Sequence, residues 1–418
     1  MTFDVPTTRG TYTSLSDGWT YLNGAERPQI PARTSAAVST SFRSAPKKLR
    51  SEPSSGIHSR SREAGSSAAA EMAMNARRAF ADMVGGRASN VVLGSSRYQL
   101  MQQLMHSMGR RLTLGTELVL SRTGRPSTRI PVERAADMFG TKLRYAEADL
   151  STGVVPSWQF DGLVNRRTRL VVVSAADPHV GAISPVRKIA DIAHQNPEAW
   201  FLVDATDFAA HRVVDMQALG ADIVLVDAAQ WGGPEVSALI FRDPMMFRKL
   251  SSVALTPAAE GAQRLEVDSA APGLLGGVGE SVQHVATLDR EAKGTRRRRI
   301  EQSVPQVQKY VETLTNRLID GLRYLDRVHI VCMDGDEAEG GVDRIGRVSF
   351  IVNGVPAATV VRRLMDNGVV TSIAERGNSG LLEAIGVFEE GGAVVVGLQP
   401  FNLRHDVDQL VRAVRSLG

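Results

Sequence analysis

Short runs of almost entirely apolar residues recur through the middle of this 418-residue chain, and segments of helical character lie between several of them. Residues 170–173 read LVVV, so this run has no polar side chain to turn toward water. Such strands are buried on both faces, which requires helices on both sides of a sheet. We therefore predict an α/β domain over residues 68–267 with a mostly parallel, mixed sheet. The predicted strands are 91–93, 117–120, 142–146, 170–174, 200–203, 223–226 and 238–241, and the predicted helices include 68–83, 94–108, 131–139 and 185–194.

The pattern changes after about residue 268. We expect residues 268–418 to form a linking helix and a smaller C-terminal α+β domain with an antiparallel sheet. Residues 1–43 are expected to be an N-terminal arm that packs on the small domain, and the Ser/Arg-rich residues 44–67 a mobile segment. The elements predicted after residue 268 are helices 279–325, 357–367 and 406–417 and strands 328–332, 347–352 and 393–398.

The basic excess of the chain is local. Lys and Arg total 49 against 45 Asp and Glu, for a net charge of +4. Residues 43–62 hold six basic residues and one acid, which leaves the rest of the chain about neutral. A nucleic-acid-binding domain spreads basic residues over a folded face. Binding of nucleic acid or a membrane surface through residues 43–62 is therefore the weakest functional hypothesis, and nucleic acid is an unlikely partner.

One cysteine, Cys332, excludes an internal disulfide framework and a thiolate metal cluster. It falls in the predicted strand 328–332, where a free cysteine is usually a small core residue. The histidines show no metal-ligand spacing, so we predict no metal site. No apolar run approaches the ~18 residues of a transmembrane helix, and residues 1–10 do not read as a secretory signal. We therefore expect a cytoplasmic protein with no membrane partner.

Five short motifs follow one another over 65 residues. In this order and spacing they resemble the core of the class V aminotransferases, the pyridoxal-phosphate enzymes that include the cysteine desulfurases. The resemblance extends over nearly the whole chain and implies a homodimer with the fold of type I pyridoxal-phosphate-dependent transferases. The motifs are LVVVS at 170–174, GAISP at 181–185, LVDA at 202–205, LGAD at 219–222 and AQWGGP at 229–234.

The resemblance places the Schiff-base lysine of the family at Gln230. A lysine amine at this position holds pyridoxal phosphate and shuttles the substrate proton. The lone pair of an amide nitrogen is delocalised into the carbonyl, so Gln230 is neither nucleophilic nor basic. Covalent attachment of the cofactor at this position is then chemically impossible. Lys188 and Lys249 lie far from this turn in the sequence and are not favoured as substitutes.

Other family positions also differ. The serine and histidine that help to hold the cofactor phosphate correspond to Asp227 and Ala229, and a carboxylate repels a phosphate dianion. The ring-stacking histidine falls at or near Arg125, and the asparagine that bonds the ring hydroxyl falls at Pro178. The phosphate-binding pair that the partner subunit contributes in this family falls at residues 268–269, where Ser269 replaces a threonine.

Two features of the family site remain. Asp204 stands at the position of the carboxylate that keeps the pyridine nitrogen protonated. Residues 94–97 (GSSR) begin a helix whose N-terminus could hold an anion with help from Arg97, or Ser95 or Ser96 could simply cap that helix. The candidate cofactor-binding or ligand-binding set is Ser96, Arg97, Arg125, Asp204 and Ser269.

These substitutions lead to two main hypotheses. The first is a noncatalytic relative, a pseudoenzyme, that binds a protein partner or a small anionic ligand in the former active-site cleft. The second is an aminotransferase-like or desulfurase-like enzyme that holds pyridoxal phosphate noncovalently, with Asp204 at the ring and Arg97 at the phosphate. A fold does not fix a reaction, so the resemblance says more about architecture than about chemistry.

Overall fold

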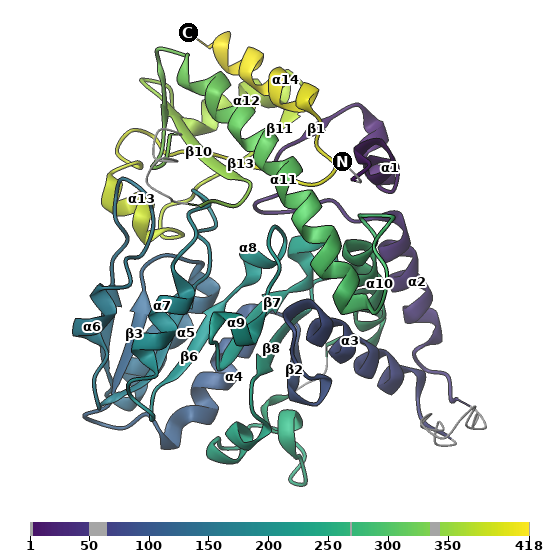
Figure 1. Cartoon of the computed structure of the whole chain (residues 1–418), viewed down its shortest axis with the longest axis vertical. Coiled ribbons are helices and arrows are strands. Elements are labelled where there is room, and N and C mark those ends of the chain that lie inside the picture. The colour runs from purple at the N-terminus through teal and green to yellow at the C-terminus, as the bar shows by residue number, and fades with distance from the viewer. Residues whose placement is uncertain (1–2, 50–64, 268–269, 335–342, 418) are drawn as a thin grey trace.

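The computed structural model describes residues 3–49, 65–267, 270–334 and 343–417. Figure 1 shows a larger and a smaller α/β unit, with the long helix α11 (Arg296–Arg323) running from one to the other. No helix in the described part of the chain is both long and apolar enough to cross a membrane.

Six of the seven strands of the larger sheet end on a common edge. Their order across the sheet is β2-β8-β7-β6-β5-β3-β4, and every pairing is parallel except those of β8 with β2 and with β7. Because β2 and β7 both run against β8, six strands share one direction. This confirms the predicted mixed, mostly parallel sheet. The strands are β2 (Val91–Gly94), β3 (Glu117–Ser121), β4 (Lys142–Ala146), β5 (Thr168–Ser174), β6 (Trp200–Asp204), β7 (Ile223–Asp227) and β8 (Ser237–Phe241).

Helices cover both faces of this sheet. They are α3 (Ala68–Val84), α4 (Arg97–Ser107), α5 (Pro126–Phe139), α6 (Gln159–Leu163), α7 (Val186–Ala193), α8 (Thr206–Ala209), α9 (Met216–Leu219) and α10 (Pro272–Ala286). Leu170 and Val172 of β5 belong to a core shared with α4 and α5, whereas Val171 and Val173 belong to a core shared with α3, α7 and α10. The all-apolar strand is therefore buried on both faces, as the sequence predicts.

The single helical stretch predicted over residues 279–325 is wrong, because the chain forms two helices there. Helix α10 ends at Ala286, and α11 begins only at Arg296. Gly294 has a φ of +103°, which a helix cannot contain, and the Thr295 side chain then accepts a hydrogen bond from the Arg298 N–H as a new N-cap.

The smaller unit contains a four-stranded antiparallel sheet in the order β12-β13-β10-β9. Apolar side chains of α11 and of two further helices, α12 and α14, pack against it in one core. This matches the predicted small α+β domain. Its elements are β9 (Val328–Ile330), β10 (Arg347–Val352), α12 (Ala357–Asp366), β11 (Val369–Val370), β12 (Ser372–Ile373), α13 (Gly380–Ile385), β13 (Val394–Gly397) and α14 (Arg404–Arg415).

Cys332 does not lie in a strand, contrary to the prediction. Strand β9 ends at Ile330, and Cys332 is half-buried with a φ of +61°. This left-handed conformation cannot continue an extended strand.

The N-terminal arm contacts both units. Strand β1 (Thr20–Tyr21) pairs with β11, and Leu22 belongs to the core of the smaller unit together with Phe3, which precedes α1 (Val5–Arg9). Helix α2 (Ala32–Ser44) instead packs on α10 and α3 of the larger unit. The arm therefore does not pack on the small domain alone. Most of the segment predicted to be mobile, residues 50–64, lies outside the described residues.

Candidate ligand-binding site

A cavity of about 730 Å³ lies where strands β2, β3 and β7 give way to the segments that follow them. The first residues of α4 and α5 line it from one side, and the turn after β7 lines it from another. Residues 26–30 of the N-terminal arm and the first half of α2 complete its wall. In open α/β sheets, ligands bind in the crevice outside the carboxyl ends of the strands.

Gln230 lies on the 3₁₀ turn Ala228–Trp231 that follows β7. The Asp227 side chain caps this turn by accepting a hydrogen bond from the Ala229 N–H at 3.0 Å. Gln230 is only 3% exposed, it lines the cavity, and its Oε1 has no hydrogen-bond partner in the described part of the structure. A buried polar atom without a partner is rare and marks a place where a ligand or water can bind.

No lysine is among the described residues that line the cavity. Lys188 lies on α7 and Lys249 at the end of a 3₁₀ turn, and both are exposed and do not line the cavity. This wall therefore offers no primary amine that could form a Schiff base.

Arg97, the first residue of α4, lies beside Asp227. Its Nε is 3.4 Å from Asp227 Oδ2, while its Nη1 is buried and has no hydrogen-bond partner among the described residues. Burial raises the pKa of Asp227, and the nearby Arg97 charge and the Ala229 N–H oppose that shift. Ser96 accepts a hydrogen bond from the Gln99 N–H at 3.1 Å. It is therefore the N-cap of α4, which is one of the two roles considered for it from the sequence.

Arg125 is fixed by two partners. Its Nε and Nη2 donate to the two carboxylate oxygens of Asp207 at 2.9 and 2.6 Å, and Nη2 also donates to the Ala25 carbonyl at 2.7 Å. Burial alone would lower the pKa of Arg125, but the Asp207 carboxylate outweighs it and raises that pKa. Burial would likewise raise the pKa of Asp207, yet Arg125 lowers it to about 2. Both groups therefore stay charged at neutral pH.

Asp204, the last residue of β6, is buried but does not line the cavity. One of its carboxylate oxygens accepts from the Thr128 hydroxyl at 2.6 Å, and the other accepts from the Thr206 N–H at 3.0 Å. Both oxygens are thus engaged by the larger unit itself.

The structure brings Ser96, Arg97, Arg125 and Gln230 to one cavity, whereas Ser269 lies outside the described residues. Thr34 and Ser127 were missed by the sequence analysis. Both line the cavity, and the hydroxyl of each is buried with no hydrogen-bond partner among the residues that the structure describes. Thr34 is far from the motifs in sequence and no pattern pointed to α2, but Ser127 follows the predicted Arg125 and could have been suspected.

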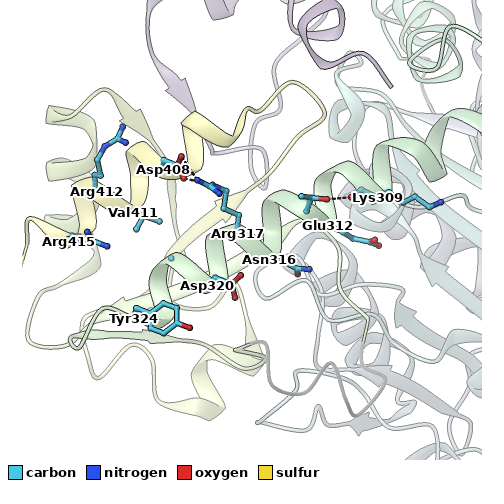
Figure 2. A pocket seen from close by; sticks show the side chains of 12 residues that line it. Lys309, Glu312, Asn316, Arg317, Asp320, Tyr324, Asp408, Val411, Arg412 and Arg415 are labelled. Carbon is cyan, nitrogen blue, oxygen red and sulfur yellow. Dashed lines mark hydrogen bonds and ion pairs between the residues drawn. The ribbon is translucent and has the colours of Figure 1, made fainter. Parts of the chain in front are cut away.

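A second hollow, of about 820 Å³, lies on the smaller unit between α11 and α14. Figure 2 shows that its side chains are of both charges and that Arg317 and Asp408 are paired across it. Its charged groups are therefore partly matched to one another, and none of the expected site residues lies there.

Comparison with known proteins identifies the family. The aminotransferase class-V model matches residues 29–264, more than half of the chain. The chain belongs to the aminotransferase class-V family. Within it, the chain is 38% identical over 419 residues to an uncharacterized protein of Mycobacterium tuberculosis, covering all of both chains.

Other class V relatives are more distant. A probable cysteine desulfurase of Pseudomonas aeruginosa is 24% identical over 345 residues, which cover 79% of each chain. The apo cysteine desulfurase of Thermococcus onnurineus has a TM-score of 0.81 at 19% identity, with 99% of this chain and 97% of that chain covered. The structural likeness establishes the cysteine desulfurase-like fold.

Pyridoxal phosphate is the usual cofactor of the class V family, so its fit to this cavity can be examined. The described lining contains no lysine that could anchor the cofactor covalently. The Asp227 carboxylate lies at the start of α4, the place where the phosphate of the cofactor would be attracted, and it would repel that phosphate. The Arg125 guanidinium is tied to Asp207 and to the arm. These residues do not fit a covalently held pyridoxal phosphate.

Proposed function

We propose that this class V aminotransferase relative is noncatalytic and binds a small anionic ligand in the cavity between α2, α4 and the turn after β7. Gln230 carries the proposal, because a buried carboxamide faces the cavity where the family resemblance places the anchoring amine. An amide nitrogen cannot attack an aldehyde at neutral pH. Without that step, the family chemistry has no starting point at this position.

Arg97 supports the anionic character of the ligand. Its Nη1 is a buried guanidinium donor that has no partner within the described ranges, and Arg97 lies at the N-terminus of α4, where the helix dipole also favours negative charge. The hydroxyls of Thr34 and Ser127 are two further groups able to donate into the same cavity. Ile30 and Leu274 also line the cavity, and their apolar side chains favour a ligand with an apolar body.

Absence of a covalent cofactor is tested by reducing the freshly purified protein with borohydride, without added pyridoxal phosphate, and measuring the intact mass. A catalytically active cysteine desulfurase serves as the positive control. We expect no mass gain, no yellow absorbance and no amino-group exchange. A stoichiometric adduct on any lysine of the purified protein would overturn the proposal.

Ligand binding is tested with benzoate, a carboxylate with an apolar ring, by thermal unfolding. A ligand that binds only the folded state raises the melting temperature. We expect millimolar benzoate to stabilise the wild type and not Arg97→Gln. Arg110→Gln, an exposed arginine beyond the other end of α4, is the matched control and should respond like the wild type.

The rival hypothesis, an enzyme with noncovalent pyridoxal phosphate, makes a different prediction. It requires saturable cofactor binding that Asp204→Ala abolishes, together with amino-group exchange. The engagement of both Asp204 oxygens by Thr128 and Thr206 gives this hypothesis less support.

A further inference from the structure

The cavity already contains an anion of its own. Asp227 is 9% exposed, lines the cavity, and directs Oδ2 toward the first residue of α4. Its Oδ1 is used differently, since it caps the turn that carries Gln230. Oδ1 of this carboxylate therefore accepts a hydrogen bond from the Ala229 N–H. Oδ2 places negative charge at the N-terminus of α4, where the helix dipole would attract a ligand anion.

The charges of the cavity wall balance. Three arginines and three acids line it: Arg27, Arg97, Arg125, Glu26, Asp227 and Glu235. Of the three arginines, Arg125 is held by Asp207 at short range, and Arg27 lies exposed. Arg97 is the one that can offer a buried guanidinium N–H, and Asp227 reduces its net attraction for a further anion.

A second, independent feature points to a ligand at this place. Gln230 is more than nine-tenths buried, lines the same cavity and has a carboxamide oxygen without a partner in the described part of the chain. This oxygen can only accept a hydrogen bond. Among the described residues, the wall thus combines the unpartnered guanidinium donor of Arg97 with the unpartnered carboxamide acceptor of Gln230, beside the Asp227 carboxylate.

We propose that Asp227 is a specificity-determining residue that restricts the cavity to ligands with a single negative charge, such as a carboxylate that also carries an N–H or O–H donor. A phosphate monoester, which is a dianion, is excluded by the neighbouring carboxylate. This inference rests on the proposed function, because it assigns the charge of the ligand that the cavity would take.

The test compares benzoate, a carboxylate monoanion, with phenyl phosphate, which is a dianion at pH 8. Binding to the wild type, Asp227→Asn and Asp243→Asn is measured by calorimetry. Asparagine keeps the cap and removes the charge. Asp243 caps a 3₁₀ turn on the exposed surface in the same way, by accepting from the Met245 N–H at 2.9 Å, and does not line the cavity.

We expect the wild type and Asp243→Asn to bind benzoate at least tenfold more tightly than phenyl phosphate. In Asp227→Asn, the dissociation constant of phenyl phosphate should fall at least tenfold and the preference should be lost or reversed. If Asp227→Asn does not fold, Asp227→Ser is used, since serine also caps and carries no charge.

The outcomes separate the two proposals. An unchanged preference in a folded Asp227 variant overturns the role of Asp227 but leaves ligand binding intact. Tighter binding of phenyl phosphate than of benzoate by the wild type also overturns it, as does failure of both probes to bind any of the proteins. Gain of phenyl phosphate binding only in the Asp227 variant supports the role of Asp227, even where benzoate binding by the wild type fails.

Discussion

Arg125, which lines the cavity, forms a two-pronged ion pair with the buried Asp207, with nitrogen to oxygen distances of 2.9 and 2.6 Å. The same guanidinium binds the Ala25 carbonyl, so the pair also joins the N-terminal arm to the larger unit. Arg347, which is fully buried on β10 of the smaller unit, donates to the neighbouring Gly24 carbonyl at 3.0 Å. Two arginines from the two units thus hold consecutive residues of the arm.

Replacing Arg125 by alanine should destabilise the protein strongly. The change leaves the Asp207 carboxylate buried without its partner, which costs roughly 3–5 kcal/mol. Chemical denaturation measures the loss. Arg317→Ala is the control, because it removes a pair of similar geometry with Asp408 that water reaches (Figure 2), and it should change stability little. Equal losses in the two variants would contradict this assignment.

Gly276 of α10 is expected to be intolerant of alanine. A Cβ there would overlap the Ser41 side chain of α2, and overpacking typically costs about 1–3 kcal/mol. Gly279 lies on the same helix with open space around its Cβ position, so Gly279→Ala should stabilise by about 0.5–1 kcal/mol through helix propensity. Urea unfolding of both variants checks the prediction. A loss of stability in Gly279→Ala as large as that in Gly276→Ala would count against close packing of α2 as the cause.

His284 should make the protein less stable in acid. Burial, with a smaller contribution from Arg33, lowers its pKa from 6.5 to about 4, and its Nε2 lies 2.9 Å from the Tyr12 hydroxyl. The unfolded state therefore takes up a proton at a higher pH than the folded state does. The contribution of neutral His284 to the free energy of unfolding is fully present above pH 6.5. It is lost as the pH falls toward 4, by on the order of 2–3 kcal/mol.

The variant His284→Gln removes this titration and should flatten the dependence of the unfolding free energy on pH between 6.5 and 4. His106→Gln, at an exposed position on α4, should follow the wild type. Retention of the full acid sensitivity by His284→Gln would show that another group is responsible.

Thr128→Val should destabilise the larger unit by about 1–3 kcal/mol, because the buried Asp204 carboxylate loses its hydroxyl donor. Thr313→Val is the matched control, since its hydroxyl bonds the Lys309 carbonyl on an exposed part of α11. Thermal unfolding should show a lower melting temperature for the first variant only. Similar melting temperatures for the two variants would mean that Asp204 does not depend on Thr128.

The elements that the sequence predicts well are those marked by a pattern of neighbouring residues, such as a run of apolar side chains. Apolar runs such as residues 170–173 avoid water only inside a sheet covered on both faces, so the strand predicted over 170–174 lies within two residues of β5 at each end. The break between α10 and α11 was missed, because a helical composition continues through it and only Gly294 and Thr295 signal the start of a second helix. Cys332 was wrongly predicted to lie in a strand, because a cysteine in the sequence does not indicate that its φ is positive.

The sequence by itself determined the α/β architecture, the order of the family motifs and the presence of a carboxamide at Gln230, since these depend on neighbouring residues and on the chemistry of one side chain. Only the tertiary structure decided that Arg97 meets Asp227, that Arg125 is held by Asp207, and that Thr34 of α2 completes the cavity. Packing brings these groups together across long stretches of chain, and no local pattern records which distant partner will satisfy a buried charge or leave a hydroxyl without one.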